Sequence, residues 1–412
     1  MENTDFTKKI YLVGGAVRDA LLGKPTKDKD YVAVGFSEED FKHLPKVGKN
    51  FPVFLQKDGS QIALARREKK IQYGYNGFST QTQQVSLYED LKRRDLTLNA
   101  IALDETTQTY YDPFNGIKDL ENKILRHISD AFCEDPLRVL RIARFRARFG
   151  IEWKIHPSTK ILIYTMREEL HHLEKNRVYQ EVKMVLLDKD SYLFFETLFE
   201  LGVLDVIFPH IYALTTLKEG NLHHLESSVF AHTMEVLKLV ESQIVPLNFS
   251  KNARLILKFA ALYHDIAKPY CYRTFGNSSG HDDINLVLPL LDISLPNSIK
   301  KPMLILIQNH IKIYLLATMR ASKCVAFFES FKRDSLLLSL QILLLFADRN
   351  GRTSLKPQHL DSNFKSTLLQ TFDALNAYSP KEWIAQNKPS KNAIKIHVLR
   401  EKIKIIKQFL RS

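Results

Sequence analysis

The apolar and polar positions divide this chain of 412 residues into two regions with different patterns. Before about residue 120, short apolar runs rich in strand-forming residues alternate with turn signals such as Asp112–Gly116. This pattern predicts a small mixed α/β domain at the N-terminus. The predicted strands begin near Ile10, Tyr31, Phe51, Ile62 and Ile101.

After about residue 120 the apolar residues recur at helical spacing, which predicts long helices and no sheet. The predicted fold class is therefore α+β, with a small mixed α/β head followed by an all-α remainder. Breaks are expected near Pro209 and near Asn350–Gly351, before a lysine-rich tail. The clearest predicted helices cover Leu137–Phe149, Arg177–Leu187, Tyr192–Leu201, Val229–Val240, Leu255–Tyr263 and Leu336–Phe346.

The charge balance points to a polyanionic partner. The formal net charge is +13, which favours RNA over the weaker alternative of a membrane surface. The cysteines Cys133, Cys271 and Cys324 are widely spaced and odd in number, which is typical of reduced thiols. The N-terminus lacks the apolar core of a signal peptide, and no apolar run reaches the length of a membrane span. We therefore expect a cytoplasmic protein with no membrane partner.

The stretch from Ile10 to Tyr31 carries the first candidate chemistry. An apolar run is followed at once by Gly14–Gly15, where the backbone can turn sharply and approach a ligand closely. A short helix and a loop then lead to Asp28 and Asp30, which enter a second strand-like run. Alternate residues of a strand share one face, so both carboxylates can hold divalent cations beside the glycine turn. Mg²⁺ bound by carboxylates and substrate phosphates is the expected arrangement for nucleotidyl transfer.

This combination of GG-x-x-RD and D-x-D resembles the signature of the polymerase-β-like nucleotidyltransferases. In detail it is similar to the class II tRNA nucleotidyltransferases, or CCA-adding enzymes, and to the related bacterial poly(A) polymerases. The resemblance implies that Asp28 and Asp30 are the catalytic Mg²⁺ ligands. It further implies that Gly15, Arg18 and Arg94 hold the nucleotide triphosphate.

A second charged cluster, Arg93-Arg94-Asp95, precedes an apolar segment. Arginine clamps phosphate through two hydrogen bonds, and Asp95 is either a third metal-side carboxylate or an orienting group. A surface ion-pair cluster is the structural alternative. In class II enzymes the matching R-R-D contacts the triphosphate and sugar. The basic stretch Arg66–Phe78, with interleaved aromatics and glycines, is expected to be either a mobile loop that touches a polyanion or a plain solvated loop.

A third cluster follows Pro136, which is favoured at the start of a helix. Arg138, Arg141, Arg144 and Arg148 recur on one face of that helix, as an anion-binding stripe or as a solvated basic face. In the family, E-D-x-x-R reads the nucleobase without a template. Carried onto this chain, the resemblance assigns base reading to Asp135 and Arg138, and the triphosphate and primer path to Arg141 and Arg144.

The segment Arg177–Glu181 resembles an R-x-x-x-E helix of the same family. An ion pair between Arg177 and Glu181, four residues apart on one helix, is expected to support the base-reading helix. That support is also its purely structural interpretation.

A second candidate site lies between residues 223 and 350. His232, the adjacent pair His264-Asp265 and Asp348 fall in helical segments, with His281 between them. Their order resembles the HD phosphohydrolase superfamily, in which such a pair binds a divalent or transition metal. Imidazole and carboxylate ligands suit Ni²⁺ or another divalent metal. The alternative is that these residues are satisfied core or capping groups.

Lys9–Gly23 and Arg126–Arg141 are most similar to the branch of bacterial CCA-adding enzymes with a C-terminal HD domain. The similarity is weaker at His223-His224 and at His281-Asp282, which affects the hydrolase more than the transferase. The resemblance implies a nucleotidyltransferase head at 1–125, a helical neck for base and primer recognition at 126–208, an HD domain at 209–350 and a helical tail at 351–412.

The expected reaction is template-independent addition of CCA to the 3′ end of tRNA from CTP and ATP, with Mg²⁺ at the transferase site. A metal-dependent phosphohydrolase on 2′,3′-cyclic or 2′ phosphates is expected in the HD domain. The chain is expected to act as a monomer or homodimer. Alternatives are a poly(A) polymerase, an enzyme that adds only CC or only A, and an RNA-binding protein with an inactive head. The last would require loss of Asp28 or Asp30, and both are present.

Overall fold

The computed structural model describes residues 7–26, 28–48, 52–70, 78–218, 227–353 and 363–410. It divides into two compact units, the first formed by residues 1–181 and 200–207 and the second by residues 182–199 and 208–412. The first unit contains the main sheet and the second is helical, so the predicted α+β class is confirmed. The finer division into four domains stays a prediction.

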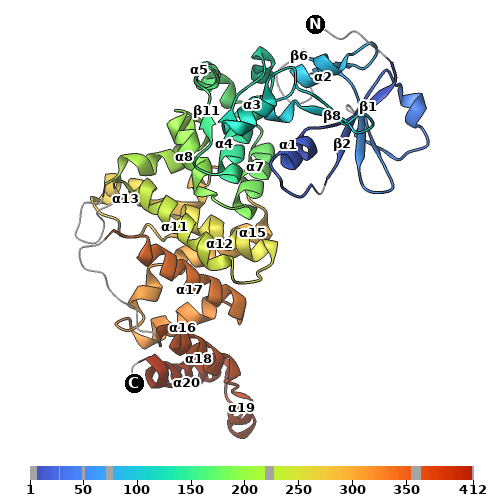
Figure 1. Cartoon of the computed structure of the whole chain (residues 1–412). Helices are drawn as coiled ribbons and strands as arrows, with labels where there is room; N and C mark the ends of the chain where they lie inside the picture. The colour runs from blue at the N-terminus through green and yellow to red at the C-terminus, as the bar shows by residue number, and fades with distance from the viewer. Residues whose placement is uncertain are drawn as a thin grey trace. The chain divides into compact units, whose positions relative to one another are not determined.

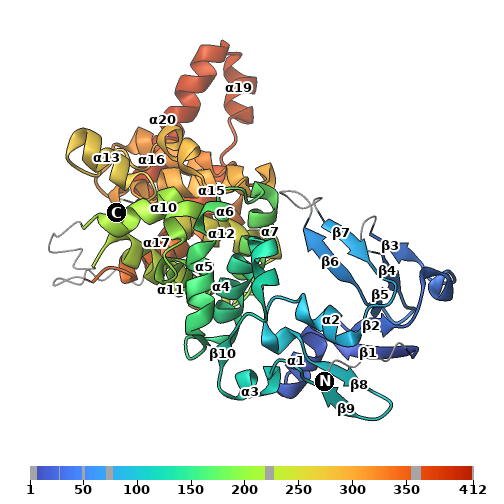
Figure 2. The ribbon, with the colours of Figure 1, turned by 90° about the horizontal axis from the view of Figure 1, so that it is seen from above.

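The first unit is built on a mixed seven-stranded sheet (Figure 2). All five predicted strands are present in it as β1, β2, β4, β5 and β8. The strand order across the sheet is β3 (Lys46–Val47), β4 (Val53–Leu55), β5 (Gln61–Leu64), β2 (Asp30–Val34), β1 (Lys9–Val13), β8 (Ala102–Asp104) and β9 (Thr109–Tyr111).

Successive side chains of β2 point to opposite faces of the sheet, and those on both faces are buried. Val32 and Val34 belong to one buried cluster, while Ala33 belongs to another on the opposite face. β1 and β2 are antiparallel, with Val13 opposite Asp30. The glycine turn that follows β1 therefore lies beside the start of β2, where the carboxylates stand.

Two local expectations are wrong. Arg67–Lys70 (β6) and Phe78–Gln81 (β7) form an antiparallel hairpin where a loop was expected, and residues 71–77 lie outside the described residues. A short parallel pair, β10 (Ile124–Leu125) with β11 (Lys154–Ile155), also occurs in the region predicted to lack sheet. Pairs of two residues are too short for an alternation pattern to reveal.

The helices of the first unit place most of the predicted site residues. Helix α4 (Leu137–Phe149) has the predicted limits, since Pro136 precedes its first turn and Gly150, at φ 114°, ends it. Helix α7 (Lys175–Leu187) passes from the first unit into the second, and α8 (Tyr192–Glu200) returns to it. The others are α1 (Gly15–Leu21), α2 (Leu87–Lys92), α3 (Gly116–Glu121), α4 (Leu137–Phe149), α5 (Pro157–Thr165), α6 (Arg167–Leu170) and α9 (Leu204–Ile207).

In the second unit, four helices pack into a bundle: α11 (Val229–Ile244), α12 (Lys251–Tyr263), α15 (Asn297–Asn309) and α17 (Ser335–Asn350). Side chains of Ser228, Ser250 and Asp334 cap the first turns of α11, α12 and α17. The shorter or peripheral helices are α10 (Pro209–Ala213), α13 (Lys268–Phe275), α14 (Ile284–Val287) and α16 (Ala321–Ser330).

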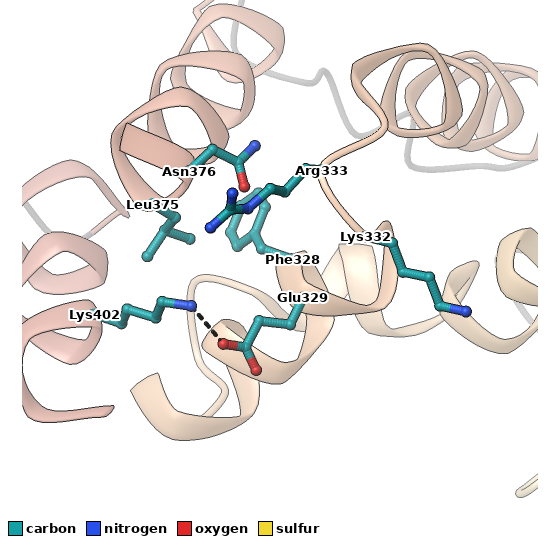
Figure 3. Close-up of a pocket in the computed structure, with 7 residues that line it drawn as sticks. All are labelled: Phe328, Glu329, Lys332, Arg333, Leu375, Asn376 and Lys402. Atoms are coloured by element: carbon teal, nitrogen blue, oxygen red, sulfur yellow. Dashed lines mark hydrogen bonds and ion pairs between the residues drawn. The ribbon is translucent and has the colours of Figure 1, made fainter. Parts of the chain in front are cut away.

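The lysine-rich tail is helical, as predicted, and comprises α18 (Phe364–Ala377), α19 (Lys381–Asn387) and α20 (Lys391–Leu410). Helix α20 packs against α18 and α16 (Figure 1). A cavity of about 260 Å³ lies between these helices, and Lys402 reaches across it to Glu329, at 2.6 Å (Figure 3). This ion pair joins α20 to α16.

Candidate functional site

The turn after β1 depends on Gly14. Its backbone adopts φ 70° and ψ −129°, a conformation that side chains with a Cβ rarely take. A Cβ at this position would also lie 3.1 Å from Nη1 of Arg94. Gly15, the residue predicted to contact the nucleotide, begins α1 and has neither constraint. The glycine that the turn needs is therefore the first of the pair.

The two predicted metal-binding carboxylates lie at the start of β2. Asp30 is the first residue of the strand and is exposed, while Asp28 precedes the strand and is also exposed. Desolvation of its carboxyl group by the surrounding protein raises the pKa of Asp30, although the residue as a whole is exposed; Arg94 opposes this rise, and repulsion from Asp28 adds to it. Because Asp28 precedes the strand, the alternation of β2 that predicted a shared face does not reach it. The two carboxylates are two residues apart in the chain, and a cation bound between them would relieve their charge. The donor set therefore fits Mg²⁺.

Asp30 opens onto a cavity of about 560 Å³ with a strongly basic lining. Nine arginines and three aspartates are among its described lining residues, a formal excess of six positive charges. Such a cavity suits a polyanion such as a triphosphate. Asp28 is not among the described lining residues, although its charge reaches Asp30. The lining residues are Gly14, Gly15, Arg18, Asp30, Arg66, Arg93, Arg94, Asp95, Asn99, Asp135, Leu137, Arg138, Arg141, Arg144, Phe145, Arg148 and Arg177.

A fully buried aspartate holds two of the cavity arginines. Oδ1 of Asp90 accepts hydrogen bonds from Arg93 Nε and Nη2, at 3.1 and 2.7 Å, and Oδ2 accepts one from Arg94 Nη2, at 3.1 Å. Burial alone would raise the pKa of Asp90, but Arg93 and Arg94 lower it to about 2. Nε of Arg94 is buried and makes no hydrogen bond with the described residues. The ion pair with Asp90 holds the Arg94 guanidinium at the wall of the cavity.

The buried carboxylate of Asp95 is held by three protein partners. Its carboxylate accepts hydrogen bonds from Leu96 N, Asn99 Nδ2 and Arg141 Nε, at 2.9, 2.8 and 2.7 Å. Burial would raise its pKa, but Arg141 and Asn99 hold the pKa of Asp95 well below its usual range. These contacts favour the orienting role over the third metal ligand, the other role considered for this residue.

Arg18 is almost completely buried and is held by its neighbours. It donates to Asp19 Oδ1 from Nε, at 2.9 Å, and to Asn99 Oδ1 from Nη1, at 2.5 Å. Its guanidinium lies over the ring of Phe145. Asp19 also accepts a hydrogen bond from Arg148, at 2.9 Å, which joins α1 to α4. Burial lowers the pKa of Arg18 despite the adjacent Asp19.

The two predicted base-reading residues lie at the start of α4 and both line the cavity. Asp135 accepts hydrogen bonds from Arg177 Nη1 and Nη2, at 3.2 and 2.8 Å, and from the backbone N–H of Leu137, at 3.1 Å. Arg138 donates to the carbonyls of Ala131 and Arg93, at 2.8 and 2.7 Å. Both side chains are therefore fixed in place by protein partners.

The expected ion pair between Arg177 and Glu181 is replaced by two ion pairs that reach other elements. Arg177 binds Asp135, and Glu181 accepts from Arg144 Nε, at 2.7 Å. The spacing is suitable for a pair along α7, but the carboxylate of Asp135 and the guanidinium of Arg144 offer closer partners. Helix α7 still supports α4, as expected, by a different route. The α4 arginines are thus held by acids and carbonyls around the cavity rather than solvated on a free basic face.

The second unit holds a separate cluster in its helical bundle, formed by buried histidines and aspartates. His232 of α11 lies 3.1 Å from Asp348 Oδ1 of α17, measured from Nε2. His264, which ends α12, lies 3.9 Å from the same oxygen and 3.3 Å from Asp265 Oδ2. The structure therefore brings together all four predicted residues of the HD site.

These residues fit a metal ion. His232, His264 and Asp348 each offer one ligand atom, and these atoms lie within 4.8 Å of one another. Nδ1 of His264 faces the carbonyl of Ala261, at 2.8 Å, and its Nε2 is buried without a hydrogen bond among the described residues. A backbone carbonyl that fixes one ring nitrogen leaves the other free to bind a metal. Asp348 is itself held by Tyr314 and Arg352, at 3.0 and 2.8 Å.

Comparison with known proteins identifies the family to which this chain belongs. Residues 10–126 match the family "Poly A polymerase head domain", and residues 153–214 match "Probable RNA and SrmB- binding site of polymerase A". The Multifunctional CCA protein of Shewanella frigidimarina is 42% identical over 360 residues, covering 84% of this chain and 84% of that protein. That of Shewanella denitrificans is 40% identical over 363 residues, covering 84% and 85%. The chain belongs to the multifunctional CCA protein family.

The predicted kinship with class II CCA-adding enzymes is therefore confirmed. A solved CCA-adding enzyme in an apo form shares the fold, with a TM-score of 0.65 and 18% identity, and the match covers 97% of this chain and 88% of that one. Within the described part of the chain, no helix combines the length and apolar character required to cross a bilayer.

Several residues of the arginine-lined cavity and of the histidine–aspartate cluster were not predicted from the sequence. Asn99 carries no motif of its own, because its role depends on Arg18, 81 positions away. Asp19 belongs to the GG-x-x-RD motif, but its contact with Arg148 spans 129 positions. Asp90 pairs with Arg93 and Arg94 only three and four residues further along the chain, a spacing that the prediction did not use. His310 ends α15 as a lone histidine after an apolar helix, and only the bundle brings it beside His281.

Proposed function

We propose that this chain adds CCA to the 3′ end of tRNA from CTP and ATP without a template. The observation that supports this most directly is the pair Asp28 and Asp30 at the start of β2, with Asp30 opening onto a cavity lined by nine arginines. A carboxylate pair beside an arginine-lined cavity suits a metal-dependent transfer that handles a triphosphate. The family relationship supplies the substrate class.

In the proposed reaction the 3′-oxygen of the tRNA forms a bond with the α-phosphorus of the nucleotide. The bond between the α-phosphorus and the bridging oxygen breaks, pyrophosphate leaves, and the hydroxyl proton passes to solvent. Mg²⁺ held by Asp28 and Asp30 would supply charge neutralisation at the reacting oxygens. Arg94, steadied by Asp90, and the arginines of α4 would bind and orient the triphosphate. The turn at Gly14 allows the backbone to approach the phosphates closely.

Nucleotide choice is assigned to Asp135 and Arg138. A carboxylate accepts from an exocyclic amine, which cytosine and adenine share, and a guanidinium donates to ring nitrogens and carbonyl oxygens. Oδ2 of Asp135 accepts one hydrogen bond from Arg177, so it has a further lone pair for a base amine. Uracil and guanine present a carbonyl at the corresponding edge and would be rejected.

The test is nucleotide dependence on tRNA trimmed to remove its terminal CCA. The full chain is incubated with CTP, ATP, both, or neither, and the products are resolved by length. The proposal expects two additions with CTP alone and three with both nucleotides, followed by a stop. A long adenylate tail would identify a poly(A) polymerase, and CC alone or A alone would identify a partial adder.

For the second unit we propose a metal-dependent phosphohydrolase that acts on 2′,3′-cyclic or 2′ phosphates. The supporting observation is the buried set of His232, His264, Asp265 and Asp348, in which His264 Nε2 is left without a hydrogen bond. Hydrolysis would join a water oxygen to phosphorus and break the ester bond, with a proton passing to the leaving oxygen. Ni²⁺ or another divalent ion held by these residues would activate the water. A His264→Ala variant that retains full activity on 2′,3′-cyclic AMP would refute the proposal.

A further inference from the structure

Glu105 holds two residues of the segment that carries the predicted Mg²⁺ ligands. It directly follows β8, at the turn into β9. Its Oε1 lies 3.1 Å from Lys29 Nζ, and its Oε2 accepts a hydrogen bond from the hydroxyl of Tyr31, at 2.9 Å. Lys29 lies between Asp28 and Asp30 in the chain, and Tyr31 is the next residue after this pair. One carboxylate therefore holds the neighbours of both predicted ligands.

These contacts lie on the face of the sheet opposite to Asp30. Tyr31 packs against the buried cluster that contains Ala33, while Val32 belongs to the cluster on the other face. Successive strand residues alternate between the faces, so Asp30 shares the face of Val32. Glu105 therefore lies behind the strand as seen from Asp30, and it leaves the carboxylate of Asp30 available to a cation.

The end of β2 that carries Asp30 is the end that core packing supports least. Burial rises along the strand, from exposed Asp30 and half-buried Tyr31 to buried Val32–Val34. Just before the strand, the carbonyl of Lys29 accepts a hydrogen bond from the backbone N–H of Gln61, at 3.0 Å. This bond holds the backbone, and the two contacts described above add a side-chain anchor before and after Asp30.

The turn that presents Glu105 is itself anchored by local hydrogen bonds. Oδ1 of Asp104 accepts from the backbone N–H groups of Thr106 and Thr107, at 2.9 and 3.2 Å. The carbonyl of Glu105 accepts from Gln108 Nε2, at 2.8 Å. Hydrogen bonds from side chains to nearby backbone groups fix the conformation of a turn. Glu105 thus extends from a fixed point of the β8–β9 hairpin.

We propose that Glu105 is a positioning residue for the metal site of the transferase. By holding Lys29 and Tyr31, it fixes the segment on which Asp28 and Asp30 stand, and so sets how well the two carboxylates can bind one ion. The inference rests on the proposed transfer reaction. Groups that orient metal ligands change the affinity for the metal without touching it, because a displaced ligand binds less well.

The alternative is an ordinary surface ion pair with no effect on metal binding. The side chains of Lys29 and Glu105 are 45% and 41% exposed, and such pairs contribute little to overall stability. The chain offers a matched control, since Lys46 of β3 binds Glu38, at 2.6 Å, with side chains 44% and 52% exposed. β3 lies at the edge of the same sheet, with β4 and β5 between it and β2.

The test measures metal binding and transfer by the full chain in the parent, Glu105→Ala, Lys29→Met and the control Glu38→Ala. Binding of Mn²⁺ is followed through the electron paramagnetic resonance signal of the free ion. A variant with both Asp28→Ala and Asp30→Ala defines the part of this binding that belongs to the transferase site. The Mg²⁺ concentration that gives half the maximal rate of CMP incorporation into trimmed tRNA is measured on the same samples.

The inference expects both Glu105→Ala and Lys29→Met to weaken Mn²⁺ binding at the transferase site and to raise the half-saturating Mg²⁺ concentration. The change should be about threefold to tenfold, less than the loss of a direct partner of a metal ligand commonly causes. The rate at saturating Mg²⁺ and the midpoint of urea unfolding should stay close to those of the parent. Adding Lys29→Met to Glu105→Ala should weaken binding no further, because their interaction is already lost.

The sign of the two effects separates positioning from simple charge. Removing the negative Glu105 would weaken the attraction for a cation, whereas removing the positive Lys29 would strengthen it. Weaker binding in both variants therefore supports positioning, and stronger binding in Lys29→Met would overturn it. Parental Mn²⁺ affinity in Glu105→Ala, or an equal loss in Glu38→Ala, would also overturn the inference.

The same measurements keep this inference apart from the proposed function. Parental Mn²⁺ binding and transfer in the variant without Asp28 and Asp30 carboxylates would refute the proposed metal site, and the inference with it. Loss of both in that variant, together with parental behaviour of Glu105→Ala, would overturn the positioning role alone.

Discussion

Arg177 binds the carboxylate of Asp135 through two hydrogen bonds, of 3.2 and 2.8 Å, across 42 positions of the sequence. Asp135 also accepts from the backbone N–H of Leu137 at the start of α4. One carboxylate is therefore oriented by a helix end and by a guanidinium from α7. This is the kind of double support that a group selecting one base over another requires, because a small rotation would change which base edge it accepts.

We expect Arg177→Ala to reduce nucleotide selectivity more than it slows addition. Without Arg177, Asp135 loses two charge-assisted hydrogen bonds, and discrimination of CTP against UTP should fall roughly tenfold or more. Selectivity is measured as the ratio of kcat/KM values for CTP and UTP on trimmed tRNA. Arg167→Ala, which removes the Arg167–Asp205 ion pair outside the cavity, is the matched control. Equal selectivity in both variants would contradict the role of Arg177.

Substitution of the two glycines of the β1–α1 turn should have different effects. Gly14→Ala forces a side chain into a conformation with φ 70° and places a Cβ 3.1 Å from Arg94. It should destabilise the first unit by about 1–3 kcal/mol and slow transfer. Gly15→Ala meets only an ordinary contact, 3.5 Å from Arg18 Nη2, and should keep the stability of the parent. Urea unfolding of both variants would check this, and equal destabilisation would refute it.

Acid should remove a component of stability that depends on Asp90. The folded pKa of about 2 lies below the ordinary value of 3.8, so the ionised group stabilises the fold above about pH 4. This component is lost as the pH falls from about 4 toward 2, and it amounts to roughly 2 kcal/mol. Asp90→Asn should lack it and show a flatter dependence in this range.

The measurement for Asp90 uses the fluorescence of buried Trp153 during urea unfolding, in a Trp383→Phe background. Both residues, Asp90 and Trp153, belong to the first unit, so the signal reports on the relevant fold. Parallel curves of unfolding free energy against pH for the parent and Asp90→Asn would contradict the predicted contribution of ionised Asp90 to stability.

Metal affinity in the second unit should depend on Tyr314. Its hydroxyl donates to Asp348 Oδ2, at 3.0 Å, and so orients the other oxygen toward His232. Loss of such a supporting hydrogen bond commonly reduces metal affinity about 10- to 100-fold. Calorimetric titration of Tyr314→Phe with Ni²⁺ should show this reduction, while the exposed Tyr212→Phe should match the parent. Unchanged affinity in Tyr314→Phe would count against the supporting role.

Much of the fold follows from periodicity, because the strands and helices are long enough to show it. The limits of α4 coincide with the prediction, since a proline and a glycine mark its ends. The hairpin β6–β7 was not predicted, because its strands do not alternate apolar and polar residues. The strands of the pair β10–β11 have two residues each, too few for an alternation of apolar residues to show.

The candidate sites were predictable where motifs carry chemistry at short range, as for Asp28 and Asp30 or for His264 and Asp265. They were not predictable where a partner comes from a distant segment. Arg177 and Glu181 have ideal spacing for a pair along α7, yet each binds a residue of the α4 region. Asn99 and His310 become meaningful only when the fold brings Arg18 or a second histidine beside them.

The central claim is that Asp28 and Asp30 together hold the ions that drive transfer. The most direct measurement is the single-turnover rate of CMP incorporation into trimmed tRNA by the parent, Asp28→Ala, Asp30→Ala and the exposed control Glu121→Gln. Losing a metal-binding carboxylate removes several kcal/mol of transition-state stabilisation, so both aspartate variants should lose roughly 10³-fold or more while Glu121→Gln matches the parent. A rate for either aspartate variant within tenfold of the parent would contradict the account.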